Sequence, residues 1–202
     1  MSNMKDWAGN KATAYVQLGA SNHSEKDREI NDYYATDPKS LIIFLKKLRE
    51  DKITLNKNIW ECACGEGHLS KVLIDNGYNV LSSDKVDRKY GIVKDFLNCD
   101  DKFNGDILTN PPYKFADKFV ETAINKVNDG NYVLMFLKVQ FLESKSRKIL
   151  FKKFPPKYVY VYSERQLCAM NGEFDKYKAT ALCYCWFIWQ KGYKGETVVR
   201  WI

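Results

Sequence analysis

The chain has 202 residues, of which 45% are hydrophobic and 28% are charged, a balance typical of one globular domain and not of a disordered segment. Its net charge of +7 favours an anionic partner, with nucleic acid first, although an excess of this size also serves solubility alone. The sequence has no apolar run of about 18 residues, so no transmembrane helix is expected, and the polar N-terminus has no apolar signal core. We therefore expect a cytoplasmic protein that does not enter a membrane.

Cysteine usage agrees with a reducing compartment. Two pairs have the spacing C-x-C, which puts both thiols of a pair on one face of a strand. This spacing differs from that of a zinc ribbon, and the chain has only two histidines. We therefore expect reduced thiols and no metal site at the six cysteines, which are Cys62, Cys64, Cys99, Cys168, Cys183 and Cys185.

The chain begins with a polar stretch, residues 1–30, that we interpret as an arm without a core of its own. A single domain is expected over residues 31–202, because no linker or internal repeat divides them. Its first helix is predicted to begin after Asp37, a good N-cap, with Pro38 at the first helical position. The apolar stripe of this helix consists of Leu41, Ile42, Phe44, Leu45 and Leu48.

Residues 58–84 have the pattern of a nucleotide-binding βαβ unit. A strand over 58–63 is followed by a glycine turn at 64–67, a helix over 68–74 and a strand over 79–83. The second strand ends at Asp84, which lies 19 residues after Gly65, close to the spacing at which a carboxylate reaches a ribose hydroxyl.

The remaining elements alternate in the same way. Short apolar runs predict strands at 92–93, 106–109, 131–139, 158–162 and 179–189. Helices are predicted over 114–127, whose apolar stripe we take to begin with Phe115, and over the basic segment 145–153. The polar residues 163–178 connect the last two strands. This order predicts an α/β fold with a mostly parallel sheet and a terminal strand pair.

The segment from Asn110 to Tyr113 follows a predicted buried strand, at the sheet edge where α/β proteins bind ligands. Asn110 offers an amide oxygen as acceptor, Pro111 and Pro112 stiffen the turn, and Tyr113 offers a ring for stacking. Acceptors beside a stacking ring suit a planar group that carries an NH2, such as adenine. A proline-rich turn with an exposed tyrosine is the alternative interpretation of this segment alone.

Together these motifs resemble the amino-group class of S-adenosylmethionine-dependent DNA methyltransferases, in particular adenine-N6 enzymes of the kind found in phages. The segment 110–113 resembles their catalytic motif, and residues 61–67 resemble their glycine-rich cofactor loop, with Glu61 in place of the more frequent Asp. The resemblance implies that S-adenosylmethionine is bound by Tyr34, Thr36, Asp37, Glu61, Ala63, Cys64, Gly65, Gly67, Asp84, Asp95 and Phe96.

The resemblance also implies a fold and a reaction. The fold is a class I Rossmann-like methyltransferase, with a seven-stranded, mostly parallel sheet, an antiparallel last strand and helices on both faces. The reaction is methyl transfer to the exocyclic N6 amine of adenine in DNA, with Asn110, Pro111, Pro112 and Tyr113 as catalytic residues. A departure from the family is that no separate target-recognition domain fits between the motifs or after Trp189.

Other substrates and functions stay open at this point. Adenine in RNA or a glutamine amide in protein could also be methylated at such a site, and a non-catalytic nucleic-acid-binding protein could retain this fold. For DNA contacts we expect basic residues of two polar stretches, namely Lys145, Arg147, Arg165, Lys176 and Lys178. Oligomeric state and target sequence are not predicted.

Overall fold

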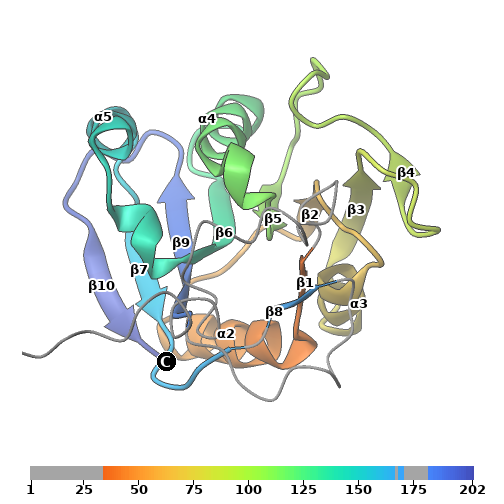
Figure 1. Ribbon diagram of the computed structural model, residues 1–202, viewed down its shortest axis with the longest axis horizontal. Helices are drawn as coiled ribbons and strands as arrows, with labels where there is room; N and C mark the ends of the chain where they lie inside the picture. The colour runs from red at the N-terminus through yellow and green to blue at the C-terminus, as the bar shows by residue number, and fades with distance from the viewer. Residues whose placement is uncertain (1–33, 167, 171–181) are drawn as a thin grey trace, which may run out of the picture.

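The computed structural model describes residues 34–166, 168–170 and 182–202, so the predicted arm at 1–30 lies outside it. One sheet of eight strands, in the order β10-β7-β9-β6-β5-β2-β3-β4, forms the middle layer (Figure 1). Its strands are β2 (Asn58–Glu61), β3 (Asn79–Asp84), β4 (Ile92–Val93), β5 (Asp106–Thr109), β6 (Tyr132–Lys138), β7 (Tyr158–Val161), β9 (Tyr184–Gln190) and β10 (Val198–Trp201).

Helices cover both faces of this sheet (Figure 1). They are α2 (Pro38–Glu50), α3 (His68–Asp75), α4 (Ala116–Lys126) and α5 (Lys145–Lys153), with the 3-10 turns η1 (Tyr113–Phe115) and η2 (Val139–Leu142). α2 begins as predicted, because Asp37 is its N-cap and accepts a hydrogen bond from Lys39 N–H at 2.9 Å. Ile42 is 51% exposed, so the predicted stripe of this helix is too wide by one residue.

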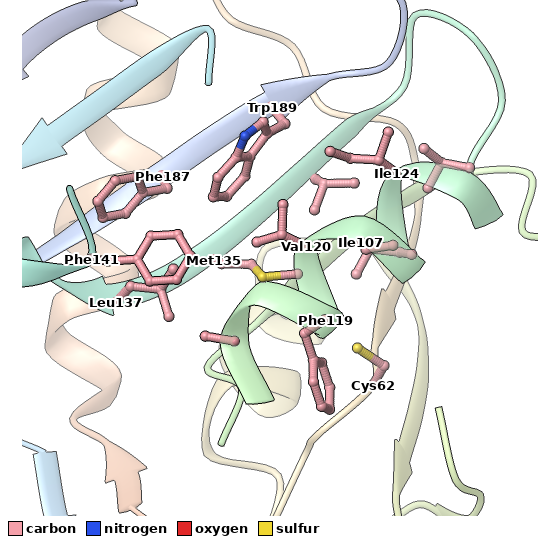
Figure 2. Packing of buried hydrophobic residues seen from close by; sticks show 14 of the residues in the cluster. Cys62, Ile107, Phe119, Val120, Ile124, Met135, Leu137, Phe141, Phe187 and Trp189 are labelled. Atoms are coloured by element: carbon pink, nitrogen blue, oxygen red, sulfur yellow. The ribbon is translucent and has the colours of Figure 1, made fainter. Parts of the chain in front are cut away.

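The alternation of side chains along β6 divides the core into two layers. Val133, Met135 and Leu137 belong to the cluster that includes α4, whereas Leu134 and Phe136 belong to the cluster that includes α2 and α3. Figure 2 shows the first cluster, in which residues of α4 lie over Met135 and over Trp189 of β9. Because β6 is buried on both faces, it has the continuous apolar sequence from which it was predicted.

β9 is the antiparallel strand of the sheet. It lies between β6 and β7 and pairs antiparallel with both, while the other neighbouring pairs of the sheet are parallel. The predicted pairing of the strands at 158–162 and 179–189 is therefore confirmed, but the antiparallel strand is not the last strand of the chain. The predicted number of seven strands is too low by one, because β10 adds parallel to β7 at the edge of the sheet.

A second, two-stranded sheet was not predicted. β1 (Tyr34–Thr36) pairs antiparallel with β8 (Cys168–Met170), with Thr36 opposite Cys168. β8 lies within the stretch that we predicted as a polar connection. Its pairing with β1 brings two segments that are distant in sequence to the same side of the large sheet, close to the end of β5 (Figure 1).

Candidate functional site

A cavity of about 700 Å³ lies at the carboxyl ends of the parallel strands. Residues that end β2 and β3, namely Glu61 and Asp84, line it together with Asn110, which follows β5. Thr36 of β1 closes it from the second sheet. The volume falls in the range of about 300–1,000 Å³ that is usual for small-molecule sites, and this edge of an α/β sheet is where such sites occur.

The amide of Asn110 has a fixed orientation. Its Nδ2 donates a hydrogen bond to Thr36 Oγ1 at 2.8 Å, and Thr36 is buried. Since an amide is planar, this bond also determines where Oδ1 lies. β1 thus contributes to the site a threonine hydroxyl that contacts the Asn110 amide, a contact that the sequence did not predict.

Tyr113 is held by contacts on its ring and at its hydroxyl. The hydroxyl lies 3.6 Å from Cys168 Sγ, and Lys138 Nζ lies 4.8 Å from the ring centroid. The Tyr184 ring is tilted by 30° relative to it, with 6.2 Å between the centroids. Burial, then the neighbouring Cys168 and Tyr184, raise the pKa of Tyr113 well above its usual value, so the phenol is neutral at physiological pH. The tyrosine is therefore part of the cavity wall and is not a freely exposed ring.

Asp84 joins the glycine turn to β3. One carboxylate oxygen accepts from Gly65 N–H at 2.8 Å, and the other accepts from Val86 N–H at 2.9 Å. A carboxylate has about four acceptor positions. Asp84 can therefore hold the turn and still accept hydrogen bonds from hydroxyl groups of a ligand in the cavity.

Glu61 is almost completely buried at the end of β2. Its carboxyl group accepts a hydrogen bond from Ser70 of α3, and the Ser70 hydroxyl also lies 2.6 Å from Ser82 Oγ of β3. Burial raises the pKa of Glu61 to about 8, with a further contribution from the nearby Asp84, while the hydrogen bond from Ser70 opposes the shift. Glu61 is thus mostly protonated at neutral pH.

Asp95 and Phe96 line the cavity beyond β4. Lys85 Nζ forms an ion pair with Asp95 at 2.8 Å, and this contact lowers the pKa of Asp95. Phe96 is only 2% exposed, and its ring is stacked on Phe119 at a centroid distance of 5.2 Å. The phenylalanine is therefore mainly a core residue whose edge contributes to the cavity wall.

The structure brings most of the predicted residues together. Lining the cavity are Thr36, Glu61, Ala63, Cys64, Asp84, Asp95, Phe96, Asn110, Pro111, Pro112 and Tyr113. Asp37, Gly65 and Gly67 do not line it. Asp37 caps α2, and the glycines, with φ of +54° and +79°, shape the turn behind the cavity wall. Of Tyr34 only the backbone in β1 is described.

Of the predicted DNA contacts, the three that the structure describes do not line the cavity. Lys145 and Arg165 are exposed, whereas the guanidinium of Arg147 is engaged within the protein by Asp117, at 3.2 Å, and by two backbone carbonyls. Lys176 and Lys178 lie outside the described residues.

Sequence patterns missed several residues at the mouth of the cavity, namely Lys114, Phe115 and Lys118. We predicted Phe115 as the start of a buried stripe, and this is wrong, since its side chain is 40% exposed. Phe115 lies in η1, before α4 begins, so the helical phase that buries Phe119 does not extend to it. The sequence did contain a signal for these residues, because Lys114 and Lys118 lie on either side of Phe115 shortly after the two prolines.

Within the described part of the chain, no group of three or more His, Cys, Asp or Glu side chains could hold a metal ion. All six cysteines are free thiols, of which Cys62, Cys64 and Cys185 are buried. No helix among these residues is long and apolar enough to cross a membrane.

No protein-family model matches the sequence, and no curated protein is similar to it by sequence. Solved structures do match the fold. A Listeria monocytogenes protein described as a class I S-adenosylmethionine-dependent methyltransferase superposes with a TM-score of 0.59, at 15% identity, over 93% of this chain and 71% of that protein. A Pyrococcus horikoshii protein described as an RNA methyltransferase gives 0.58, at 12% identity, over 80% of this chain and 87% of that protein.

A Vibrio vulnificus protein described as the modification subunit of a type I restriction enzyme gives a TM-score of 0.58 at 13% identity. The match covers 91% of this chain but only 49% of that protein. The chain therefore has the fold of the class I S-adenosylmethionine-dependent methyltransferases, with the cavity at the carboxyl ends of the parallel strands.

Proposed function

We propose that this protein is a methyltransferase that transfers a methyl group from S-adenosylmethionine to the exocyclic N6 amine of adenine in DNA. The observation that carries the proposal is the hydrogen bond from Asn110 to Thr36, which holds an amide at the cavity wall beside Tyr113. A planar amine needs acceptors at such a place, and we assign that role to Asn110 Oδ1 and the Pro111 carbonyl.

The cavity chemistry fits S-adenosylmethionine, which supplies an electrophilic methyl group on a positively charged sulfur. Carboxylates of Asp84 and Asp95 line the same cavity and suit the cationic and hydroxyl-bearing parts of this molecule, and the protonated Glu61 beside them can form hydrogen bonds. We assign the ribose hydroxyls to Asp84. Residues 31–202 are proposed to act as one catalytic domain.

The chain's own residues would orient the amine and stabilise the charge that develops on it. The N6 lone pair forms the bond to the methyl carbon while the bond from that carbon to sulfur breaks, and the proton then leaves for solvent. No general base is needed before transfer, because the amine becomes acidic only as it is alkylated. Most of the rate should come from orientation and from preset dipoles.

Asn110→Ala tests this assignment. It should lower the rate of methyl transfer to DNA at least about 100-fold, because the loss of one preorganised hydrogen bond to the transition state has an effect of this size in other enzymes. The affinity for S-adenosylhomocysteine should stay within about threefold of the wild-type value. Thr36→Val is the matched variant, because it removes the partner of the amide but keeps the amide itself. It should lose activity less severely. Calorimetry measures binding, and tritiated methyl transfer measures activity.

The substrate class is tested by offering DNA, RNA and protein in parallel to the wild-type enzyme with tritiated cofactor. Transfer to DNA adenine supports the proposal. RNA is the second candidate, because one structural neighbour is described as an RNA methyltransferase. Transfer to protein only, or to none of the three while the cofactor binds, would contradict the proposal.

A further inference from the structure

We propose that the substrate nucleic acid docks on the rim formed by Lys114, Phe115 and Lys118. The two ammonium groups would contact phosphates that flank the target nucleotide, and the Phe115 ring would contact a neighbouring base. This inference rests on the proposed function and specifies where that function holds its polymer. We call these three residues the η1–α4 rim.

The first support is position. The η1–α4 rim begins directly after the proline turn and lines the same cavity as Asn110 and Tyr113. Thr36 and Asn110 lie deep in the cavity, whereas both lysines are exposed and Phe115 is 40% exposed. Because these exposed residues line the cavity, a polymer whose target base entered it on this side would contact them.

The second support is charge. The acidic residues of α4, Asp117 and Glu121, are each paired with a cation of the neighbouring helix α5, namely Arg147 and Lys153. Within the described residues neither Lys114 nor Lys118 forms an ion pair, so the charges on the rim are not compensated there. Figure 1 shows α4 and α5 side by side on one face of the sheet.

The same pairing weakens the case for Arg147 and Lys153 of α5 as phosphate contacts. Arg147 is held by Asp117 and also lies 4.6 Å from the centroid of the Phe141 ring. To contact a phosphate it would have to break contacts within the protein. Lys114 and Lys118 have no such ionic contact to break within residues 34–166, 168–170 and 182–202.

The third support is the exposed aromatic ring. Phe115 is 40% exposed where it lines the cavity, and Lys114 Nζ lies 5.7 Å from its ring centroid. Aromatic rings beside cations are the composition of grooves that bind single-stranded nucleic acid, where bases stack and phosphates pair. The carboxylate of Asp84 also lines the cavity and would repel phosphate, whereas the rim would attract it.

The double variant Lys114→Gln/Lys118→Gln tests the inference. Binding is measured by fluorescence anisotropy with labelled adenine-containing oligonucleotides, single-stranded and duplex, in the presence of S-adenosylhomocysteine. Affinity should fall at least about tenfold, and the slope of log affinity against log salt should become shallower by roughly 1.4–1.8, because about two phosphate contacts are lost.

The matched control is Lys46→Gln/Lys57→Gln, which removes the same charge at exposed sites on α2 and at the opposite end of β2. It should bind like the wild type. Phe115→Ala should weaken binding about tenfold with an unchanged salt slope, because stacking does not release counterions. Phe115→Leu keeps an apolar side chain without the ring and should show the same loss of affinity. It replaces Phe115→Ala in this test if the alanine variant folds poorly.

The outcomes separate the two proposals. If the wild type binds and methylates nucleic acid but the rim variant matches the control in affinity and salt slope, the docking inference is wrong and the proposed function stands. If the wild type binds cofactor but neither DNA nor RNA, both are wrong. All variants should bind S-adenosylhomocysteine as the wild type does, since Asp84, to which we assign the ribose hydroxyls, is unchanged in them.

Discussion

Glu61 keeps a proton at a pH at which most glutamates have lost theirs. Its pKa rises from 4.5 to about 8 because the carboxyl group is buried at the end of β2. Between these two values the unfolded chain is ionised at this position while the folded chain is protonated. Unfolding then releases a proton, so the free energy of unfolding falls as pH rises, by up to about 1.4 kcal/mol per pH unit for this group.

Glu61→Gln should remove this dependence while keeping a side chain that accepts from Ser70. The wild type should lose stability relative to the variant as pH rises from about 5 to about 8, and the difference should level off above that range. Asp106, whose pKa is also raised by burial, is present in both proteins and cancels in the comparison. Urea unfolding at several pH values measures the difference, and parallel stability curves would contradict the protonated state.

At the scale of elements, the turn between β2 and α3 depends on a close approach of backbone and side chain. Gly67 is the N-cap of α3 in a left-handed conformation, with φ of +79°. A Cβ at this position would come within 2.3 Å of the Tyr90 ring. The glycine is therefore required both by its φ and by the space available to it.

Gly67→Ala should lower the free energy of unfolding by more than the roughly 1–2 kcal/mol expected when an alanine adopts a left-handed backbone conformation, because Tyr90 must also move. It should also weaken binding of S-adenosylhomocysteine, since the turn carries Gly65, the partner of Asp84. Gly130→Ala is the control, with φ of +84° and no atom within 4 Å of the added Cβ. Equal losses of stability, measured by urea unfolding, would show that the Tyr90 contact has no cost.

Elements with a local signal were predictable, and those held by distant contacts were not. The unit of β2, α3 and β3 follows from its periodicity and its glycine turn. β8 has three residues and exists through its pairing with β1. β10 is an edge strand with exposed Val198, Val199 and Trp201, so it has no burial pattern to detect. The pairing of Arg147 with Asp117, on another helix, is likewise invisible in sequence.

At the scale of the whole molecule, a polar network joins β10 to the C-terminal end of α2. Arg200 Nη1 of β10 lies 2.6 Å from Asp51 Oδ2, and the Tyr160 hydroxyl of β7 donates to the same oxygen at 2.6 Å. Burial alone would raise the pKa of Asp51. Hydrogen bonds from Tyr160, Arg200 and Lys47 outweigh this and lower it to about 2. Asp51 is therefore ionised at neutral pH, and the network loses its contribution to stability as pH falls from about 4 to about 2.

Arg200→Met should destabilise the protein by about 1–2 kcal/mol at neutral pH, because it removes a charge-assisted hydrogen bond from a partly exposed site. Lys47→Met is the control. It breaks the local pairs of Lys47 with Asp51, at 3.2 Å, and with Glu50, at 3.7 Å, but leaves the contacts of Arg200 in place, and it should cost about 0.5 kcal/mol or less. Urea unfolding measures both. If Arg200→Met were no worse than Lys47→Met, β10 would be held by strand pairing alone.

The position of β9 has a consequence for biosynthesis. β9 (Tyr184–Gln190) lies between β6 and β7 in the sheet but follows both in the chain. While the ribosome is still making the residues before Tyr184, β6 has an unpaired, apolar edge, and β7 has no partner through which to join the sheet. Open edges of this kind favour association between chains. A newly made chain should therefore depend on chaperones most in the interval between the emergence of β6 and that of β9.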